Sequence, residues 1–281
     1  MPDSRGTDQA EYWRSAQQWV DFQDMLDTLM QPVLDRLLTE SALKPGTRIL
    51  DIGCGTGAST MAAARLVAPD GHVTGADISD IMLALARERT DAAGLENVTY
   101  LEGDAQTFPL GETAFDTVIS RFGVMFFDDP VAAFRNIARA VRPGGRMVFL
   151  AWGALADNPW FALPRQAAVD VLGTPPPVDP RAPGPMAFSD KDYVAGILRD
   201  AGWRDVDIPD VSVELTPRGG VSDVAAFATQ VGPASRIIKD LGGTADDAAK
   251  IETRVTKAMT RFDTGAGIRV PATLNLVRAM R

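Results

Sequence analysis

Residues 48–58 restrict the fold of this chain more than any other stretch. The apolar residues at positions 49, 50 and 52 predict a short buried strand, and three glycines follow it within five positions, Gly53, Gly55 and Gly57. Glycines allow a tight turn and leave no Cβ where a ligand approaches the backbone. Small residues from 58 to 67 then predict a helix whose free N–H groups point back at the turn. Because such a unit binds nucleotides in open α/β sheets, the sequence predicts a nucleotide site here.

Composition and charge argue against several classes of function. The chain has 281 residues, of which 46% are apolar and 23% charged, as in an ordinary soluble globular protein of one or two domains. Its formal net charge of −9 argues against a nucleic-acid partner, because neutralising phosphates requires clustered Lys and Arg. No apolar run reaches about 18 residues, so we expect no membrane span. Residues 1–6 are polar and lack the apolar core of a signal peptide, so we expect a cytoplasmic protein; a monomer and a homodimer both stay open.

The chain contains one cysteine, Cys54, and one histidine, His72. A single cysteine forms no internal disulfide, and with a single histidine a Cys/His zinc site is excluded, so we expect no metal. We interpret Cys54 as a small residue of the turn, because no histidine is placed to activate it as a nucleophile.

Short apolar strands alternate with helical stretches through the middle of the chain. Strands are predicted at residues 49–52, 72–76, 98–101, 115–120 and 146–152, and helices at 58–67, 79–91 and 129–141. This alternation is typical of βαβ units and of a parallel sheet with helices on both faces. Before it, an apolar stripe at three-to-four spacing predicts one or two helices over residues 9–41, with a break near Pro32. The sequence Arg-Pro-Gly-Gly at 142–145 predicts a turn.

The composition changes after residue 152. Residues 173–188 are rich in proline and predict an extended excursion, while helices are expected at 189–201 and 221–262 and strands around 205–215 and 270–279. We therefore expect an N-terminal helical lid (1–44), a cofactor-binding core (45–152), a Pro-rich cap (153–188) and a final part (189–281). In that final part, residues 189–215 and 268–281 would complete the core sheet around a helical cap insertion at 221–262.

Three aspartates lie at the ends of three successive predicted strands: Asp51, Asp77 and Asp104. In a parallel sheet, their carboxylates lie along one rim beside the glycine turn. Asp77 comes 20 residues after Gly57, where an acidic side chain accepts hydrogen bonds from ribose hydroxyls. A ligand with a cationic end, a ribose and an adenine suits this row, with Asp51 at the cation, Asp77 at the ribose and Asp104 at the amino group of the base. Asp77 or Asp104 by itself also fits a helix N-cap or a solvated strand end.

The motifs around these aspartates closely resemble, in order and spacing, those of class I S-adenosylmethionine-dependent methyltransferases. They are residues 50–57 (LDIGCGTG), 75–79 (GADIS), 103–105 (GDA) and 142–145 (RPGG). The resemblance covers about residues 45–152. Within the class, Trp13, Trp19 and residues 120–127 (SRFGVMFF) are similar to the small-molecule methyltransferases of ubiquinone and menaquinone biosynthesis. The resemblance to the class implies a Rossmann-like α/β fold with a mostly parallel seven-stranded sheet, helices on both faces, an antiparallel C-terminal strand and a helical lid.

The resemblance also implies S-adenosylmethionine as the cofactor and S-adenosylhomocysteine as its product. Gly53, Gly55 and Gly57 would line the methionine and ribose portions, with Asp51 near the ammonium and Asp77 on both ribose hydroxyls. Ile78 and Met82 would pack on the adenine, and Gly103, Asp104 and Ala105 would lie at its edge. Ser120 and Arg121 would lie near the transferred methyl. The remaining candidates for the cofactor site are Cys54, Thr56 and Trp19.

We expect the acceptor to be a small apolar or aromatic molecule, bound between the sheet rim and the lid. The candidate residues that line the acceptor site are aromatic side chains and one methionine: Trp13, Trp19, Phe122, Met125, Trp152, Trp160 and Phe161. The N-terminal aromatic stripe fits core packing as well. No catalytic base is identified. Arg121 is the one candidate for a catalytic group, and it fits binding of an anionic acceptor, stabilisation of a phenolate, or a structural ion pair.

Two other functions stay open. Gly53-x-Gly55-x-x-Ala58 also satisfies the relaxed fingerprint of NAD(P)-dependent oxidoreductases, although Asp104 and the helices before the first strand argue against that class. A non-catalytic cofactor-binding protein of the same fold is the other alternative, because a fold does not imply turnover.

Overall fold

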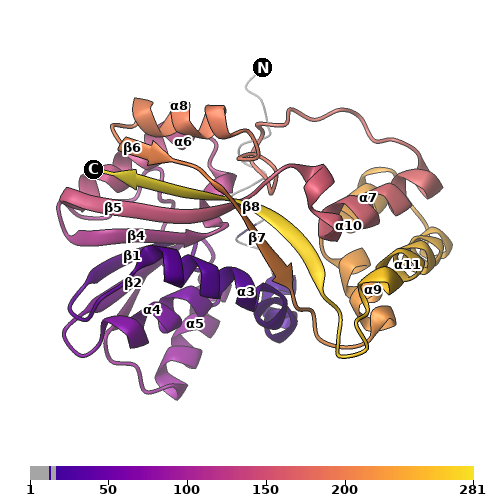
Figure 1. The fold of residues 1–281 in the computed structure, drawn as a ribbon, viewed down its shortest axis with the longest axis horizontal. Coiled ribbons are helices and arrows are strands. Elements are labelled where there is room, and N and C mark those ends of the chain that lie inside the picture. Colours follow the sequence, from indigo (N-terminus) through magenta and orange to yellow (C-terminus); the bar gives the residue numbers. More distant parts are fainter. Residues whose placement is uncertain (1–12, 14–16) are drawn as a thin grey trace.

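One sheet forms the centre of the molecule in the computed structural model, which describes residue 13 and residues 17–281. Within these residues the sheet has eight strands in the order β3-β2-β1-β4-β5-β8-β6, and β7 also pairs with β8 (Figure 1). The strands are β1 (Arg48–Ile52), β2 (His72–Asp77), β3 (Val98–Glu102), β4 (Phe115–Arg121), β5 (Val141–Trp152), β6 (Arg204–Asp207), β7 (Asp210–Leu215) and β8 (Val270–Met280). β1 to β5 run parallel and β8 runs antiparallel to β5. The predicted fold class is therefore confirmed.

The eighth strand arises because the strand predicted at 205–215 is divided. β6 and β7 both pair with β8, and the register jumps from Asp207 opposite Arg278 to Asp210 opposite Asn275. Pro209 lies at the break and has no N–H to donate to a ladder, although its carbonyl accepts from Leu276 N at 3.0 Å. Two short strands thus take the place of the single strand predicted at 205–215, which raises the number of strands from seven to eight.

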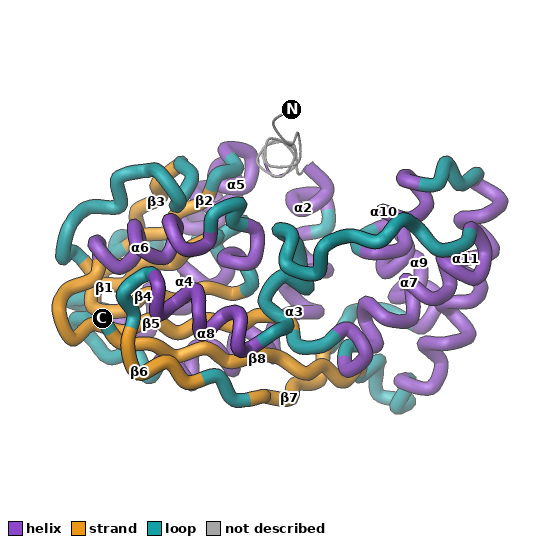
Figure 2. The backbone as a smooth tube through the Cα atoms, turned by 90° about the horizontal axis from the view of Figure 1, so that it is seen from above, coloured by secondary structure: helices purple, strands orange, loops and turns teal. Residues whose placement is uncertain are grey.

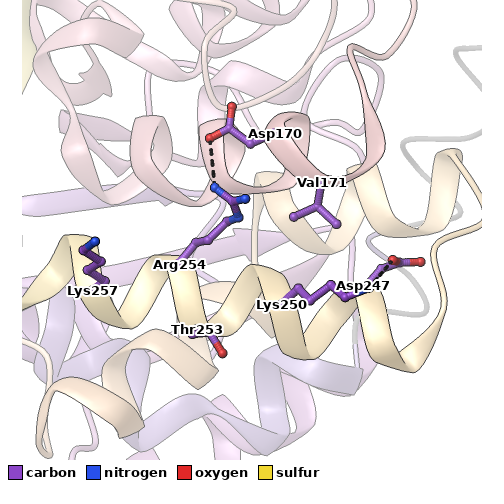
Figure 3. Close-up of a pocket in the computed structure, with 7 residues that line it drawn as sticks. All are labelled: Asp170, Val171, Asp247, Lys250, Thr253, Arg254 and Lys257. Carbon is purple, nitrogen blue, oxygen red and sulfur yellow. Dashed lines mark ion pairs between the residues drawn. The ribbon is translucent and has the colours of Figure 1, made fainter.

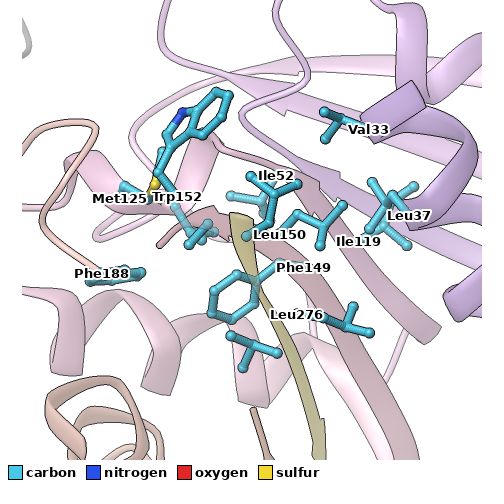
Figure 4. Close-up of a cluster of buried hydrophobic side chains, with 14 of the residues drawn as sticks. Val33, Leu37, Ile52, Ile119, Met125, Phe149, Leu150, Trp152, Phe188 and Leu276 are labelled. Carbon is cyan, nitrogen blue, oxygen red and sulfur yellow. The ribbon is translucent and has the colours of Figure 1, made fainter. Parts of the chain in front are cut away.

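Helices cover both faces of the sheet. They are α3 (Gln23–Ser41), α4 (Ala58–Val67) and α5 (Asp80–Ala92) on one face, and α6 (Pro130–Ala140) and α8 (Lys191–Asp200) on the other (Figure 1). Val33 and Leu37 of α3 pack toward Ile119, whereas Phe149 and Phe188 fill the opposite side (Figure 4). α3 is therefore a layer of the core and not the lid that we predicted for residues 1–44. Among the described helices, none combines the length and apolarity needed to cross a membrane.

Pro32 does not break the N-terminal helix, so that prediction is wrong. α3 continues through Pro32, and the break lies at Phe22, between α2 (Gln17–Asp21) and α3. The missing N–H of Pro32 would leave the carbonyl of Thr28 without its helical partner. The hydroxyl of Thr216, just after β7, donates to that carbonyl at 2.9 Å, and Thr216 N donates to Leu29 O at 3.3 Å. A residue distant in sequence thus makes the proline tolerable.

The segment Arg-Pro-Gly-Gly at 142–145 is a wide bulge inside β5 and not a turn that precedes it. Phe115 of β4 lies opposite Val141, and the next pair is Thr117 with Arg146, so four residues of β5 are looped out. Gly144 has φ +76° there, a conformation that glycine adopts without strain. The strand therefore begins five residues earlier than predicted.

A separate group of helices lies beyond the end of β7 and β8 (Figures 1 and 2). It consists of α7 (Pro159–Leu172), α9 (Val221–Gln230), α10 (Pro233–Asp240) and α11 (Ala245–Met259), which pack on one another. We call these four helices the cap. The Pro-rich stretch after α7 leads back from the cap to α8 (Figure 2). Residues 221–262 are mainly helical, ending in the short 3₁₀ helix η3 (Thr260–Phe262), in line with the predicted insertion.

Candidate functional site

The glycine turn between β1 and α4 contains three residues with positive φ. Gly53, Gly55 and Gly57 have φ values of +67°, +55° and +86°. A Cβ on Gly53 would lie 2.5 Å from Gly123 Cα, and a Cβ on Gly57 would lie 2.6 Å from the hydroxyl of Tyr100. Backbone and packing both require glycine at these two positions. Sequence reasoning did not assign a role to Gly123, although it lies in the stretch 120–127, or to Tyr100, because both act through contacts between segments distant in sequence.

Gly55 differs from Gly53 and Gly57 because a Cβ built there would clash with no atom. The nearest atom to it is Met82 Sδ, at 3.9 Å, which is van der Waals contact. Glycine at this position is therefore required by the positive φ and not by packing. Met82 is 5% exposed and Ile78 is half-buried, and Met82, one of the predicted adenine-packing pair, lies beside this glycine.

Asp77 connects the end of β2 to the glycine turn. Its Oδ2 accepts from Gly55 N at 2.8 Å, and its Oδ1 accepts from Ser79 N at 2.9 Å. The N-cap of α5 is Ser79, whose hydroxyl accepts from Met82 N, so the helix-cap interpretation of Asp77 does not hold. Burial raises the pKa of Asp77, while the backbone donors oppose that shift. The backbone of Ile78 is a third donor to this carboxylate. A carboxylate has about four acceptor positions, so about one remains for a ligand hydroxyl.

Asp51 is fully buried with half of its carboxylate bonded. Oδ2 accepts from the hydroxyls of Ser59 at 2.6 Å and Thr60 at 2.7 Å, both in the first turn of α4. Oδ1 is buried and has no hydrogen-bond partner among the residues that the structure describes. Burial raises the pKa of Asp51 to about 6, although the two hydroxyls and Arg121 lower it. An unsatisfied acceptor with a raised pKa is suited to a cationic ligand.

Within the described residues, Arg121 at the end of β4 has an unsatisfied buried donor, where Asp51 has an unsatisfied buried acceptor. Its Nη2 lies 3.9 Å from Asp27 Oδ1, and its Nη1 is buried without a partner in the described part of the chain. Burial lowers the pKa of Arg121, and the charges of Asp27 and Asp51 oppose this shift. Because β1 and β4 are neighbours, with Asp51 opposite Ile119, the unsatisfied donor and the unsatisfied acceptor lie at the same edge of the sheet.

Ser120, predicted near the transferred methyl, uses its hydroxyl within the protein. Its Oγ donates to Ile52 O at 2.7 Å and accepts from Gly123 N at 3.1 Å, and the residue is 1% exposed. The hydroxyl therefore holds the glycine turn against the turn that follows β4. A Cβ on Gly123 would meet Gly53 Cα at 2.6 Å, so the two turns touch through their backbones.

The other turn residues have local partners. The carbonyl of Thr56 accepts from Arg89 of α5 at 2.7 Å. Cys54 is buried, and burial together with the charges of Asp77 and Asp51 raises the pKa of its thiol well above the usual range, so a thiolate is disfavoured.

The loop after β3 is held by Asp104. Its Oδ1 accepts from the backbone N–H of Gln106 at 2.9 Å, and both carboxylate oxygens accept from the Gln106 amide. Ala105 is buried beside this loop. A Cβ on Gly103 would lie 2.4 Å from the ring of Phe108, so packing requires glycine there.

Six of the seven predicted acceptor-lining residues divide into three groups, and Met125 lies outside them. Phe122 stacks on Trp152 with centroids 4.4 Å apart, and Trp152 meets Phe161 edge-on at 4.8 Å. Phe122 has φ +69°, which is strained for a residue with a side chain.

The second group extends into the cap and the third lies at the N-terminal helix. The ring centroids of Trp160 and Phe227 of α9 are 6.0 Å apart, and those of Phe227 and Phe22 are 5.3 Å apart. Trp13 contacts Trp19 at 5.3 Å and Phe126 at 4.7 Å. Met125 is 1% exposed and belongs to the core (Figure 4). Phe22, Phe126 and Phe227 were not predicted.

Two surface grooves lie apart from this edge of the sheet. The first, between α7 and α11, is lined by Asp170, Val171, Asp247, Lys250, Thr253, Arg254 and Lys257 (Figure 3). Its charges are mostly paired, with Arg254 at 3.7 Å from Asp170 and Lys250 at 3.8 Å from Asp247. The second is lined by residues of α6, α8 and the preceding loop, among them Arg181 and Tyr193. Neither groove contains a predicted site residue.

Comparison with known proteins identifies the domain around the glycine turn. Residues 49–145 match a family model described as a methyltransferase domain. The chain is 38% identical over 115 residues to demethylmenaquinone methyltransferases of Staphylococcus aureus, strains JH9 and Newman among them. This similarity covers 41% of the chain and 47% of those relatives, so the chain spans about half the length of the curated relatives it matches.

Solved structures share the fold over most of the chain. The YcgJ protein of Bacillus subtilis has a TM-score of 0.56 and 18% identity, over 88% of this chain and 97% of that one. Phosphoethanolamine N-methyltransferase 2 of Haemonchus contortus, in complex with S-adenosyl-L-methionine, has a TM-score of 0.53 and 22% identity, over 89% and 52%. The [4+2]-cyclase SpnF has a TM-score of 0.52 and 19% identity, over 89% and 80%. At these identities the likeness concerns the fold alone.

Proposed function

We propose that the chain, whose residues 49–145 match a methyltransferase domain, transfers a methyl group from S-adenosylmethionine to a small apolar or aromatic acceptor. S-adenosylhomocysteine is the product that remains. The observation that carries the proposal is the pair of unsatisfied buried atoms, Asp51 Oδ1 and Arg121 Nη1, in the described part of the chain.

These two atoms suit the amino-acid end of the cofactor. That end carries an ammonium and a carboxylate, and the site offers a buried acceptor on Asp51 and a buried donor on Arg121. A buried polar group left without a partner costs about 1–3 kcal/mol, and more for a charged group. A zwitterionic ligand would satisfy both groups at once, whereas a ligand with a single charge would satisfy one of them. The pair therefore favours an α-amino acid moiety over the pyrophosphate of NAD.

The adenosine would lie along the rim formed by β2 and β3. Asp77 would accept from the ribose with the acceptor position that its backbone donors leave free, and Gly55, which has no side chain, would allow the ligand close to the backbone. Ile78 and Met82 would pack on the adenine, and Asp104 with the Ala105 backbone would contact its edge. Cys54, Thr56 and Gly57 would shape the turn around the methionine portion, while Gly103 and Ser120 act through packing and backbone hydrogen bonds.

The main catalytic device in this proposal is positioning. The sulfonium of the bound cofactor supplies an electrophilic methyl group. The chain holds the donor by Asp51, Asp77 and Arg121 and aligns an acceptor with it. Holding two reactants in line can lower a barrier by about 7–11 kcal/mol. In this scheme Arg121, the one candidate for a catalytic group, binds the cofactor carboxylate. No described side chain is assigned as a general base.

The acceptor would lie against Phe122, Trp152 and Phe161, next to Arg121 at the end of β4. Phe122→Ala is expected to raise the acceptor KM about tenfold, since a buried aromatic contact contributes about 1–2 kcal/mol beyond smaller side chains. The Kd for S-adenosylhomocysteine should stay unchanged in the same variant. An unchanged KM would remove Phe122 from the acceptor site. The contribution of Trp13, Trp19, Met125 and Trp160 to that site stays a prediction.

Calorimetry with S-adenosylhomocysteine and with NAD tests the proposal. Binding of S-adenosylhomocysteine, with loss in Arg121→Met and Asp51→Asn, is the expected result. Binding of NAD alone would overturn it in favour of an oxidoreductase. A second experiment incubates the protein with methyl-labelled donor and a library of phenols, quinols and amines. Cofactor binding without transfer to any compound would favour a non-catalytic protein of the same fold.

A further inference from the structure

A chain of polar contacts connects α3 with the glycine turn through two residues that the sequence did not single out. Arg89 of α5 donates to Thr56 O at 2.7 Å and to Asp27 Oδ2 of α3 at 2.6 Å. The other oxygen of Asp27 faces Arg121 at 3.9 Å. Asp27 therefore lies between two guanidinium groups, one of which touches the turn and the other of which has the unsatisfied Nη1.

We propose that Asp27 is a positioning residue for the carboxylate of the bound cofactor, acting through Arg121. The proposal rests on the proposed function, in which Arg121 binds that carboxylate. Asp27 holds the two arginines together and leaves Arg121 Nη1 directed at the ligand. The N-terminal helix α3 thereby contributes to a site whose other parts come from β1, β2 and β4.

The contact lengths support this division of work. Asp27 Oδ2 is already used by Arg89 and by Gln23, which donates to it at 2.5 Å. Its Oδ1 lies beyond hydrogen-bond distance of Arg121, so it attracts the guanidinium without taking up its donors. Arg121 keeps its donor fork for a bidentate contact, the geometry in which arginine binds carboxylates best.

Electrostatics gives a reason for an anion at this position. Arg89 and Arg121 repel each other, and the proximity of Arg89 lowers the pKa of Arg121, as burial does. The charge of Asp27 opposes both effects. Without Asp27, one guanidinium would have to turn outward to solvent.

Docking of α3 does not depend on Asp27. Leu29, Val33 and Leu37 on the same helix are fully buried against the sheet, so an isosteric change at position 27 should leave the fold intact. The residue can therefore be tested in the whole protein. Asp24, one turn earlier on α3 and exposed, is a matched control for loss of one negative charge.

The test is a cycle of two ligands and three proteins. S-adenosylhomocysteine and its analogue without the carboxylate, 5′-deoxy-5′-(3-aminopropylthio)adenosine, are titrated calorimetrically into the wild-type protein, Asp27→Asn and Asp24→Asn. We expect Asp27→Asn to weaken S-adenosylhomocysteine about tenfold and the analogue less than about twofold, a coupling typical of groups in contact. Asp24→Asn should bind both ligands as the wild type does, and Asp27→Glu should restore most of the loss.

Three results would overturn the proposed role of Asp27 and leave the proposed function untouched. They are equal losses for both ligands, which mark a purely structural residue; no loss for either; and tighter binding of S-adenosylhomocysteine, which marks a competitor of the carboxylate. If Asp27→Asn does not fold, Asp27→Ser and Asp27→Glu are titrated instead, and the selective loss must appear in the uncharged variant alone. A wild-type protein that binds neither ligand would overturn the proposed function as well.

Discussion

The edge of the sheet around the glycine turn and the helical cap are built in opposite ways. At the edge, charged side chains are buried, and Asp51 and Arg121 each keep an unsatisfied atom in the described part of the chain. In the cap, apolar residues such as Val224, Phe227 and Ile251 are buried, and the charges stay on the surface in pairs. Buried charge without a partner is costly, so it persists where a ligand repays the cost. The difference separates the region suited to chemistry from the region that shapes its surroundings.

The largest expected difference concerns two glycines with nearly equal φ, Gly53 at +67° in the turn and Gly242 at +65° in the cap. A Cβ on Gly53 would lie 2.5 Å from the backbone of Gly123, whereas a Cβ on Gly242 meets nothing within 4 Å. Gly242→Ala should cost about 1–2 kcal/mol from backbone strain alone. Gly53→Ala should cost about 4 kcal/mol or more, because strain and a backbone clash add. Urea denaturation measures both, and equal losses would contradict the backbone contact between the two turns.

A carboxylate at the edge and one in the cap should differ in their effect on ligand binding. Asp51→Asn removes the charge that faces the ammonium and should weaken S-adenosylhomocysteine about a hundredfold, since a hydrogen bond to a charged group contributes about 1.5–3 kcal/mol. Asp246→Asn, on an exposed face of α11, should leave the Kd unchanged. The Kd values come from calorimetry, and parallel behaviour of the two variants would place the ligand elsewhere.

The raised pKa of Asp51 should also make binding depend on pH. The pKa is about 6 without ligand, and the groups that act on Asp51 are Ser59, Thr60, Arg121 and Asp77. An ammonium favours the ionised carboxylate, so binding releases a proton and affinity falls as the pH falls through 6. Between pH 7 and pH 5 we expect about a tenfold loss of affinity for S-adenosylhomocysteine. The dependence should disappear in Asp51→Asn; a flat wild-type profile would contradict a cation at Asp51.

The smallest expected effect concerns the ion pair in the groove of the cap. Arg254 lies 3.7 Å from Asp170, and its side chain is 55% exposed. Arg254→Ala should lower the free energy of unfolding by less than about 1 kcal/mol, because solvent screens exposed pairs. The Kd for S-adenosylhomocysteine should not change. A large loss of binding would show that the cap groove communicates with the sheet edge.

Patterns within short stretches predicted much of the fold and part of the site. The run of residues 48–58 is a strand, a turn and a helix, and Asp77 does hydrogen bond to Gly55 in that turn. These features depend on neighbours in sequence and on the regular spacing of βαβ units. Predictions of breaks and turns from proline and glycine did worse. Pro32 continues its helix because Thr216 takes the freed carbonyl, and the turn predicted at 142–145 is a bulge.

By itself, the sequence determined the α/β class, the glycine turn and the aspartates at the strand ends, because each is encoded by residues within one βαβ unit. Only the tertiary structure decided which side chains meet across the sheet edge. Gly53 touches Gly123, Ser120 is used by backbone groups, and Asp27 reaches Arg89 and Arg121. Strand order brings these residues together from distant positions, and burial then sets which polar atoms stay unsatisfied. Local spacing specifies neither strand order nor burial. The sequence therefore named Asp51 and Arg121 as candidates, whereas their unsatisfied atoms within the described residues and the part played by Asp27 emerged only from the fold.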